Sequence, residues 1–161
     1  MGVLLTPKGP SMRSVIAAVL TLSFASPALA ATGFPQGFSD APYGPRFTLG
    51  TAMAWAPDGS GRLFITRQGH PRGQGANNEA EIIIIRNGQL LPAPFAVVTP
   101  VLNFSECGLF GITFDPNFNV NGYVYVSACV SNMEQQIIRY TAVGDTGTNK
   151  TIILPGLPTV G

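Results

Sequence analysis

The sequence predicts an all-β chain built from about two four-stranded β-propeller blades. A hairpin pattern carries this prediction: residues 109–114 and 123–127 are rich in aromatic and β-branched side chains, and Asp, Asn, Pro and Gly dominate the loop between them. The same pattern occurs earlier in the chain, at residues 53–58 and 61–66. Units of several short strands that recur with a period of roughly 40 to 60 residues are typical of propeller blades.

The register of the repeat follows from matching the two copies. Trp55 corresponds to Phe114, an offset of 59 residues, and residues 61–66 correspond to 122–127, an offset of 61. A third strand recurs with an offset of 53, where residues 83–86 match 136–139. Each blade is therefore expected to contain the same three strands in the same order, with a fourth strand on the outside.

The first blade is assigned to residues 50–104, after an extended lead-in over residues 31–49 that Gly and Pro interrupt. A polar, glycine-rich segment, residues 68–80, predicts a long loop within it. Asn87 and Gly88 are the favoured pair for a two-residue hairpin turn. Three later prolines predict an irregular outer strand, because the free edge needs no hydrogen-bond donors. The predicted strands are 51–56, 62–66, 81–86 and an outer strand beginning at 90–91.

The second blade is assigned to residues 105–161, with strands predicted at 109–114, 123–127, 135–140 and 151–154 and a loop-like end over 154–161. The two cysteines of the chain lie at the open end of its hairpin. If the hairpin is symmetric about Phe118, Cys107 and Cys129 face each other near the separation that a disulfide requires, and a bulge would shift this by one residue. A structural disulfide is the prediction, and buried free thiols are the alternative.

Residues 1–30 have the pattern of a secretory signal peptide. Lys8 and Arg13 form a positive region, residues 15–24 an apolar core, and residues 28–30 a small-residue cleavage site. The apolar run is shorter than the about twenty residues that a membrane span needs. We therefore expect a secreted or periplasmic protein with no membrane span after signal removal; an uncleaved anchor is the alternative, and Met12 is a second candidate start.

The charge composition argues against a nucleic-acid-binding protein. Charged residues make up 11% of the chain, against about a quarter in typical domains, and the formal net charge is +1. Nucleic-acid-binding proteins carry a concentrated basic surface, which this composition does not supply. Neutral partners are the expectation.

Four segments carry a specific resemblance: PDGSGRLFIT, IRNGQLLPAPF, ECGLFGITFDPNFNVNGYVYV and IIRYTAVGD. Together they resemble the opening of the secreted PQQ-dependent glucose/sorbosone dehydrogenases, also called soluble aldose sugar dehydrogenases, over residues 49–157. The resemblance implies a six-bladed propeller that holds pyrroloquinoline quinone (PQQ) and calcium and oxidises sugars at the anomeric carbon. It also implies that this chain corresponds to the N-terminal part of such a protein.

Glu106 is the one residue that the resemblance marks for binding. It directly precedes the innermost strand of the second blade, at the mouth of the propeller channel, where the family often has Gln or Glu near the sugar and the cofactor. A turn-capping or surface role is the alternative. The family's histidine base lies in a His-Asn-Gly-Gly-like motif that would follow Gly161, so no catalytic residue is assigned, and neither PQQ nor calcium is expected to bind this chain alone.

Other polar residues are interpreted as structural. His70, the only histidine, is predicted to be a solvated loop residue. Arg67 and Arg72 are also predicted to be solvated, and contact with an anionic ligand is the alternative. The loop containing Asp115, Asn117, Asn119 and Asn121 imitates a calcium-binding EF-hand loop. However, Val120 and Val126 stand where such a loop needs Gly and Glu, so turns stabilised by Asx side chains are the better interpretation.

Three functional hypotheses follow. The first is a part of a quinoprotein sugar dehydrogenase with a sugar substrate. The second is a non-catalytic secreted propeller module that binds glycan or protein, and the third is a truncated product without an independent function. Two blades of a ring leave apolar faces open on either side, so self-association through these faces is also expected.

Overall fold

The computed structural model describes residues 33–69, 78–103 and 106–159. The chain divides into two units, residues 1–40 and residues 41–161. In the described part of the first, the Phe38 amide donates to the Pro35 carbonyl at 3.0 Å and closes a turn. The predicted signal peptide lies outside the described residues. Within the described part of the chain, no helix has the length and apolarity needed to cross a membrane.

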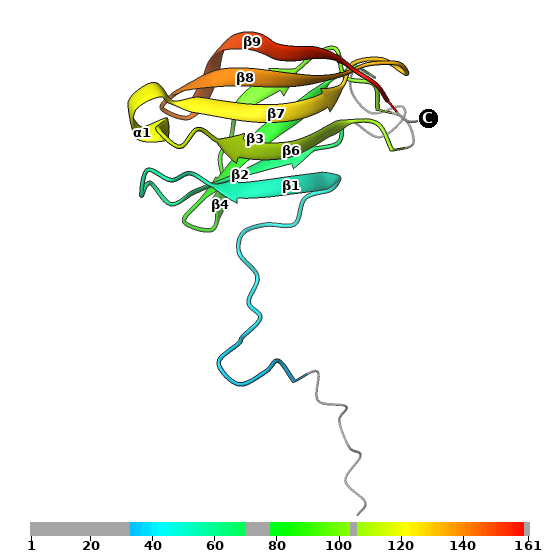
Figure 1. The fold of residues 1–161 in the computed structure, drawn as a ribbon. Helices are drawn as coiled ribbons and strands as arrows, with labels where there is room; N and C mark the ends of the chain where they lie inside the picture. The colour runs from blue at the N-terminus through cyan, green and yellow to red at the C-terminus, as the bar shows by residue number, and fades with distance from the viewer. Residues whose placement is uncertain (1–32, 70–77, 104–105, 160–161) are drawn as a thin grey trace, which may run out of the picture. The chain divides into compact units, whose positions relative to one another are not determined.

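The second unit contains two antiparallel sheets (Figure 1). Sheet one has the order β1-β2-β3-β4, and β5 also pairs with β3. The fourth strand of this sheet is split because Pro92 and Pro94 lie between β4 and β5, which confirms the predicted irregular edge. Its strands are β1 (Gly50–Trp55), β2 (Arg62–Arg67), β3 (Ala80–Arg86), β4 (Gln89–Leu90) and β5 (Ala96–Val98).

Sheet two has the order β6-β7-β8-β9. The predicted hairpin is present, and one short helical turn, α1 (Phe118–Asn121), lies within its loop. The predicted loop-like end is wrong in part, because β9 continues through Pro155 and Gly156 to Leu157. The strands are β6 (Leu109–Phe114), β7 (Tyr123–Cys129), β8 (Gln135–Val143) and β9 (Thr146–Leu157).

Strand pairing confirms the repeat in the first hairpin of each sheet. Trp55 pairs with Leu63, and Phe114 pairs with Val124, which reproduces the offsets of 59 and 61. A backbone bond closes both hairpins: the Gln68 amide donates to the Leu49 carbonyl at 2.8 Å, and the Cys129 amide donates to the Gly108 carbonyl at 2.9 Å. The two sheets therefore begin as copies of one structure.

The predicted offset of the third strand is wrong by two residues. Leu63 pairs with Ile85, and its counterpart Val124 pairs with Tyr140, so Ile85 corresponds to Tyr140 with an offset of 55 rather than 53. The matching run of Ile and Arg residues misled the sequence alignment because β8 extends beyond the end of β3 before its turn. A shift of two residues keeps each side chain on its predicted face.

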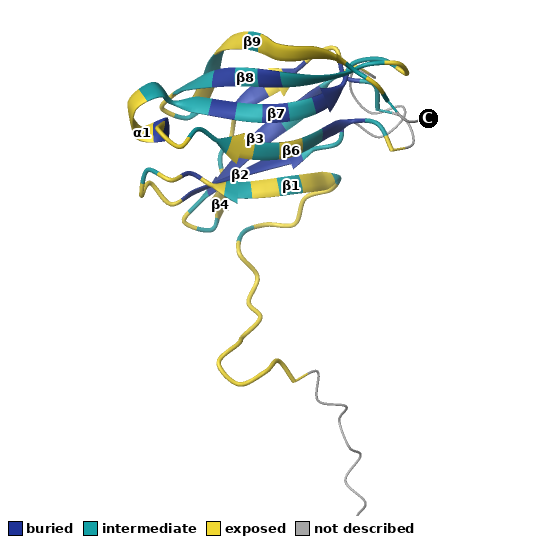
Figure 2. Cartoon of the chain, viewed as in Figure 1, coloured by how far each residue is buried: buried dark blue, intermediate teal, exposed yellow. Residues whose placement is uncertain are grey.

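The main hydrophobic core lies between the two sheets, where the buried bands of β2, β3, β7 and β8 meet (Figure 2). Phe64 of sheet one packs edge-on against Phe114 of sheet two, with ring centroids 5.1 Å apart, and against Phe95 at 4.9 Å. Each such aromatic pair contributes about 0.5–1.5 kcal/mol beyond the area it buries. The core thus holds the two blades together as one unit.

The second face of sheet one is covered in part, which corrects the expectation that both outer faces are open: Met53 and Trp55 of β1 lie on this face and remain 71% and 53% exposed. Leu63, Ile65, Ile83 and Ile85 point away from sheet two and are nevertheless buried. The lead-in passes over this face: a Cβ on Gly44 would lie 3.0 Å from Cδ1 of Ile85. We call residues 43–49 the strap.

Candidate functional site

The strands β1 and β6 begin at the same end of the two sheets. The Thr51 hydroxyl donates to the Leu109 carbonyl at 2.7 Å, and these residues lie near the starts of the two strands. Glu106 therefore lies at this end, together with the last residues of β2 and β7 (Figure 1). We call it the entrance end; the opposite end, with Asp58, α1 and the β8–β9 turn, is the turn end.

The segment after Glu106 is fixed against sheet one. The Gln68 side-chain amide donates to the Cys107 carbonyl at 2.9 Å, and the Leu109 amide donates to the Gln68 carbonyl at 3.0 Å. A Cβ on Gly108 would lie 2.3 Å from Cγ of Gln68, so only glycine fits at this close approach. These contacts set the position from which Glu106 projects.

Glu106 is exposed and lies three residues before the first residue of β6. A solvent-exposed carboxylate at a strand entrance can accept hydrogen bonds from hydroxyl groups of a ligand. Glu134 is a second carboxylate at this end: its Oε1 accepts from the Gln136 side-chain amide at 2.8 Å and from the Gly156 amide at 3.1 Å. These two bonds, that from Gln136 first, lower the pKa of Glu134, so it is ionised at neutral pH.

The two cysteines lie together at the entrance end as unbonded thiols, Cys129 buried and Cys107 half-buried. Burial, followed by the hydrogen bond with the Cys129 thiol, raises the pKa of Cys107 to about 11. A nucleophilic cysteine requires a thiolate and therefore a lowered pKa. Cys107 is thus unsuited to nucleophilic catalysis in this environment, and the predicted disulfide stays a prediction.

The register of the hairpin explains how the cysteines approach. The hairpin is symmetric about Asn119 rather than Phe118, since Phe114 pairs with Val124, and this alone would displace the predicted pairing by two residues. The bulge between Phe110 and Ile112 reduces the displacement to one, so that Leu109 pairs with Ala128 and Gly108 rather than Cys107 stands opposite Cys129. Cys107 and Cys129 are diagonal neighbours. The predicted direct pairing is therefore wrong by one residue, because the loop is centred one residue later than predicted and the bulge offsets only half of the resulting displacement.

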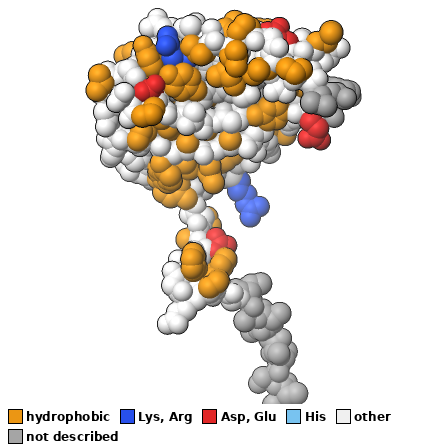
Figure 3. Space-filling model, viewed as in Figure 1, with side chains coloured by type: hydrophobic (Ala, Val, Ile, Leu, Met, Phe, Trp, Pro, Cys, Tyr) orange, Lys and Arg blue, Asp and Glu red, His pale blue; other side chains and the backbone are white. Residues whose placement is uncertain are grey.

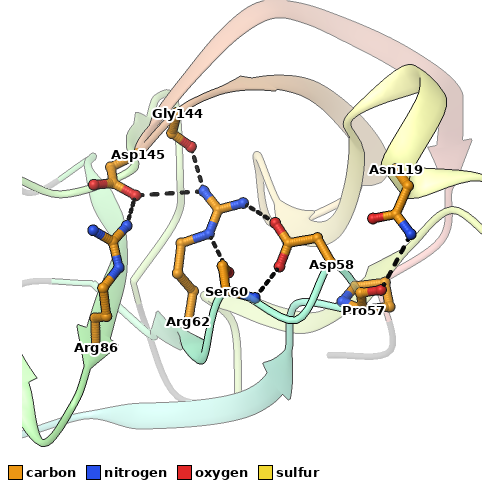
Figure 4. A network of polar contacts seen from close by, with 8 residues as sticks. All are labelled: Pro57, Asp58, Ser60, Arg62, Arg86, Asn119, Gly144 and Asp145. Carbon is orange, nitrogen blue, oxygen red and sulfur yellow. Dashed lines mark hydrogen bonds and ion pairs between the residues drawn. The ribbon is translucent and has the colours of Figure 1, made fainter.

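A cleft of about 400 Å³ lies at the turn end, away from Glu106. Its charged wall is a network that sequence reasoning did not single out (Figure 4). Arg62, which is only 6% exposed, donates to Asp58 at 2.5 Å, to Ser60 at 2.9 Å and to the Gly144 carbonyl. Burial alone would raise the pKa of Asp58, but the hydrogen bonds from Ser60 and Arg62 outweigh it and lower this pKa to about 2.

The network joins the two sheets. Arg62 and Arg86 of sheet one both reach the Asp145 carboxylate in the β8–β9 turn of sheet two. Two arginines and two aspartates balance in charge, so this wall offers no net attraction to an anionic ligand. These four side chains hold the two sheets together, and we call them the clamp. The cleft beside the clamp supports no assignment of a substrate site.

The remaining predicted polar residues have separate outcomes. His70 and Arg72 lie outside the described residues. Arg67 forms an ion pair with Glu81 at 2.7 Å, so its interpretation as a solvated residue is wrong. In the predicted Asx loop, the Asp115 carboxylate accepts from the Asn117 amide at 2.9 Å, and the Asn121 side chain accepts from the Tyr123 amide at 3.0 Å, which confirms that interpretation.

The side chains at the entrance end do not match the chemistry of PQQ or calcium. PQQ carries several carboxylates and calls for cationic partners, but this end presents Glu106, Glu134 and two thiols, and the nearby Arg67 is bound to Glu81. No cluster of three or more His, Cys, Asp or Glu side chains able to hold a metal occurs in the described ranges. The described residues therefore do not form a site for either group.

Comparison with solved structures identifies the fold. An oxidoreductase of Thermus thermophilus described as a glucose dehydrogenase matches 70% of this chain with a TM-score of 0.56 and 25% identity. The PQQ-bound form of aldose sugar dehydrogenase from Streptomyces coelicolor matches 72% with a TM-score of 0.57 and 17% identity. No model of a protein family matches the chain, and no curated protein does.

The chain spans about a third of each of these structures, 30% and 33% of their lengths. It is therefore an all-β chain with the β-propeller fold of a part of the PQQ-dependent aldose sugar and glucose dehydrogenases. Both the predicted fold class and the resemblance read from the sequence are confirmed at this level.

Proposed function

We propose that this chain is the N-terminal part of an exported sugar dehydrogenase-like protein and that its entrance end forms part of a sugar-binding surface. The observation that carries the proposal is the structural match to two dehydrogenases over about 70% of the chain. The position of Glu106 supports it, since an exposed carboxylate at the start of an inner strand faces the channel in a propeller.

The role proposed for Glu106 is to orient the substrate. Its carboxylate would accept hydrogen bonds from two neighbouring sugar hydroxyls, while the contacts of Gln68 with Cys107 and Leu109 keep the segment in place. A hydrogen bond to a charged group contributes more than one between neutral groups. Glu106 is therefore a binding residue in this proposal, and the proton transfer of sugar oxidation is assigned to a histidine outside this chain.

PQQ in complete relatives supplies the acceptor for the hydride from the anomeric carbon. Since the described residues of this chain do not form its site, the expected result for the chain alone is no PQQ-dependent sugar oxidation. The assay is reconstitution with PQQ, calcium and an artificial electron acceptor. Turnover that survives His70→Ala would contradict the proposal that the base lies elsewhere, and turnover lost in that variant would assign the base to His70.

A glycan-binding module without catalysis is the second candidate. Two carboxylates at one end of the sheets favour this candidate: Glu106 is exposed, and Glu134 is ionised at neutral pH. Sugar-binding proteins use such hydrogen-bond acceptors irrespective of redox chemistry. A complete protein that contains the His-Asn-Gly-Gly-like motif would favour the dehydrogenase. A complete propeller without that histidine would favour the binding module.

Direct binding of an aldose tests the part that both candidates share. Saturation-transfer NMR with glucose is the measurement, and Glu106→Ala is expected to weaken binding at least about tenfold, since a hydrogen bond to a charged group contributes about 1.5 kcal/mol or more. Glu106→Gln, which keeps an acceptor oxygen, is the matched control and is expected to weaken binding less. Equal binding by the chain and both variants would remove Glu106 from the site.

A further inference from the structure

Asparagine is followed by glycine at two places in the chain, Asn87-Gly88 and Asn121-Gly122, and both pairs lie in hairpin loops at the turn end. This pair of residues favours spontaneous deamidation, because glycine has no side chain to shield its backbone nitrogen from the asparagine carboxamide. The two sites share the reacting groups and differ in the hydrogen bonds around them. Their local structure therefore decides which of them reacts in the folded protein.

Asn87 and Gly88 form the two-residue turn between β3 and β4, and Asn87 is exposed. Within the described ranges, neither the Asn87 side chain nor the Gly88 amide makes a hydrogen bond. A Cβ on Gly88 would meet no atom within 4 Å. Hydroxide and water therefore reach both reacting groups.

The turn at Asn87 is closed by a very short strand. β4 contributes only two residue pairs, Ile85 with Leu90 and Arg86 with Gln89. The reaction requires the carboxamide of Asn87 and the next backbone nitrogen to rotate into a five-membered ring, so the turn must open briefly. A hairpin end held by two pairs at the edge of a sheet opens locally at a small cost in free energy.

The corresponding groups of the second pair are held in place. Oδ1 of Asn121 accepts from the Tyr123 amide at 3.0 Å. The Gly122 amide donates to the Phe118 carbonyl at 2.8 Å, and the Gly122 carbonyl accepts from the Ala142 amide at 2.7 Å. The Gly122 nitrogen must lose its hydrogen bond before it can be deprotonated, and the carboxamide must leave its own partner to approach it.

We infer that Asn87 is a site of spontaneous deamidation in the folded chain and that Asn121 is protected from it. The Gly88 nitrogen, deprotonated by hydroxide, attacks Cγ of Asn87: the N–Cγ bond forms, the Cγ–Nδ2 bond breaks, and Nδ2 leaves as ammonia. Water then opens the cyclic imide at either carbonyl and leaves aspartate or isoaspartate at position 87. Water replaces ammonia in the net reaction, which needs no oxidant or reductant.

The products change the edge of sheet one. Both carry a new carboxylate, which lowers the formal net charge of the chain by one from +1. This charge appears next to Arg86, whose guanidinium is bound to Asp145 in the clamp (Figure 4). Isoaspartate also adds one atom to the backbone, and a two-residue turn cannot absorb it without a shift of the pair of Arg86 and Gln89. The inference goes beyond the proposed sugar binding and does not depend on it.

Peptide mapping of the full chain during incubation in mildly alkaline buffer tests the inference. Samples are digested with pepsin at acid pH, where the reaction is slow, and mass spectrometry measures the exchange of NH₂ for OH at each site. In the folded chain, Asn87 is expected to react at least about tenfold faster than Asn121, because the hydrogen bonds at the second site must break first. In urea, which removes these bonds, the two rates are expected to converge.

Two variants link the reaction to a charge change in the intact protein. Asn87→Gly removes the carboxamide and tolerates the positive φ of 51° at this position, so the more acidic species that ion exchange resolves after incubation should disappear. Asn121→Gly is the matched control and should leave that species unchanged. The inference is overturned by a rate at Asn87 no higher than that at Asn121 in the folded chain, by a ratio of rates that urea does not change, or by an acidic species that persists in Asn87→Gly.

Discussion

The two sheets of this chain share a topology and differ in what their surfaces contact. Both begin with the same hairpin, closed by equivalent backbone bonds from Gln68 and from Cys129. Sheet one is covered by sheet two on one face and, over β2 and β3, by the strap on the other, whereas the outer face of sheet two is open. Across the visible surface, hydrophobic side chains are widespread and charged ones are few (Figure 3).

The comparison shows that the same backbone position takes a different residue type according to its contacts. Arg62 of sheet one anchors the clamp to sheet two, and its counterpart in sheet two is Tyr123, which stacks with Arg139 instead. Asp58 corresponds to Asn117 by the repeat. The fold requires the strands, but the polar residues at these positions depend on whether a neighbouring sheet is present.

The largest effect is expected from removing the clamp. Arg62→Ala leaves Asp58 and the Gly144 carbonyl without their cationic partner, and breaking a buried pair in this way destabilises by about 3–5 kcal/mol. Tyr123→Ala, at the equivalent position of sheet two, is expected to destabilise by no more than about 1–2 kcal/mol, because its ring is only half-buried. Urea unfolding followed by Trp55 fluorescence measures both, and equal losses would show that the clamp does not distinguish the sheets.

The second effect concerns the cysteines, which sheet one lacks. Oxidation of Cys107 and Cys129 is expected to stabilise the chain by about 3 kcal/mol, through a closed loop of roughly twenty residues. Peptide mapping of exported protein without reduction should recover the two linked peptides. Two freely alkylated thiols in folded, air-oxidised material would refute the disulfide.

The reduced protein gives a separate test of the same site. The pKa of Cys107 is raised from 9.0 to about 11, so its thiolate fraction at pH 8 is expected to be about a hundredfold below that of an unfolded chain. Iodoacetamide should therefore modify Cys107 correspondingly more slowly in the folded, reduced protein. Equal rates before and after unfolding in urea would show that burial does not protect the thiol.

Sequence patterns predicted the features that depend on local rules. Runs rich in aromatic and β-branched residues located the strands, and the pair Asn87 and Gly88 gave the hairpin turn, in which both residues have positive φ, 51° and 74°. The clamp could not be predicted, because Arg62 and Asp145 are far apart in the sequence and meet only after the sheets pack. The strap was missed for a similar reason: residues 43–49 have no periodicity and acquire their role from the face they cover.

The third effect is a pH dependence of stability that comes from Asp58, a residue that sheet two replaces with Asn117. The folded-state pKa of Asp58, about 2, is below its ordinary value of 3.8, so its contribution to stability is complete above about pH 4 and is lost as the pH falls toward 2. Solvent screens this carboxylate in part, so its contribution is expected to be about 1–2 kcal/mol, less than the full difference in pKa would give. Asp58→Asn, which installs the residue type of sheet two at Asn117, should remove this part of the acid sensitivity. Urea unfolding at about pH 6 and about pH 2 measures it, and an unchanged pH dependence in the variant would assign the sensitivity to other groups.

The smallest effect is expected at Tyr140, whose counterpart in sheet one is Ile85. Its ring packs in the core near Phe95, with centroids 6.3 Å apart, while its hydroxyl is buried without a hydrogen-bond partner, and burial raises its pKa to about 12. An unsatisfied buried hydroxyl is destabilising, so Tyr140→Phe should raise the free energy of unfolding by about 1 kcal/mol.

Tyr125→Phe is the matched control for this substitution, because the Tyr125 hydroxyl donates to Asp115 and its removal should lower stability by about 0.5–1.5 kcal/mol. The two substitutions delete the same atom from the two faces of sheet two and are expected to act with opposite signs. Thermal and urea unfolding of both variants at neutral pH measure the sign of each change in the free energy of unfolding. A loss of stability in Tyr140→Phe would mean that its hydroxyl has a partner in solution, such as a buried water, and that the inner face of sheet two tolerates polar groups as the outer face does.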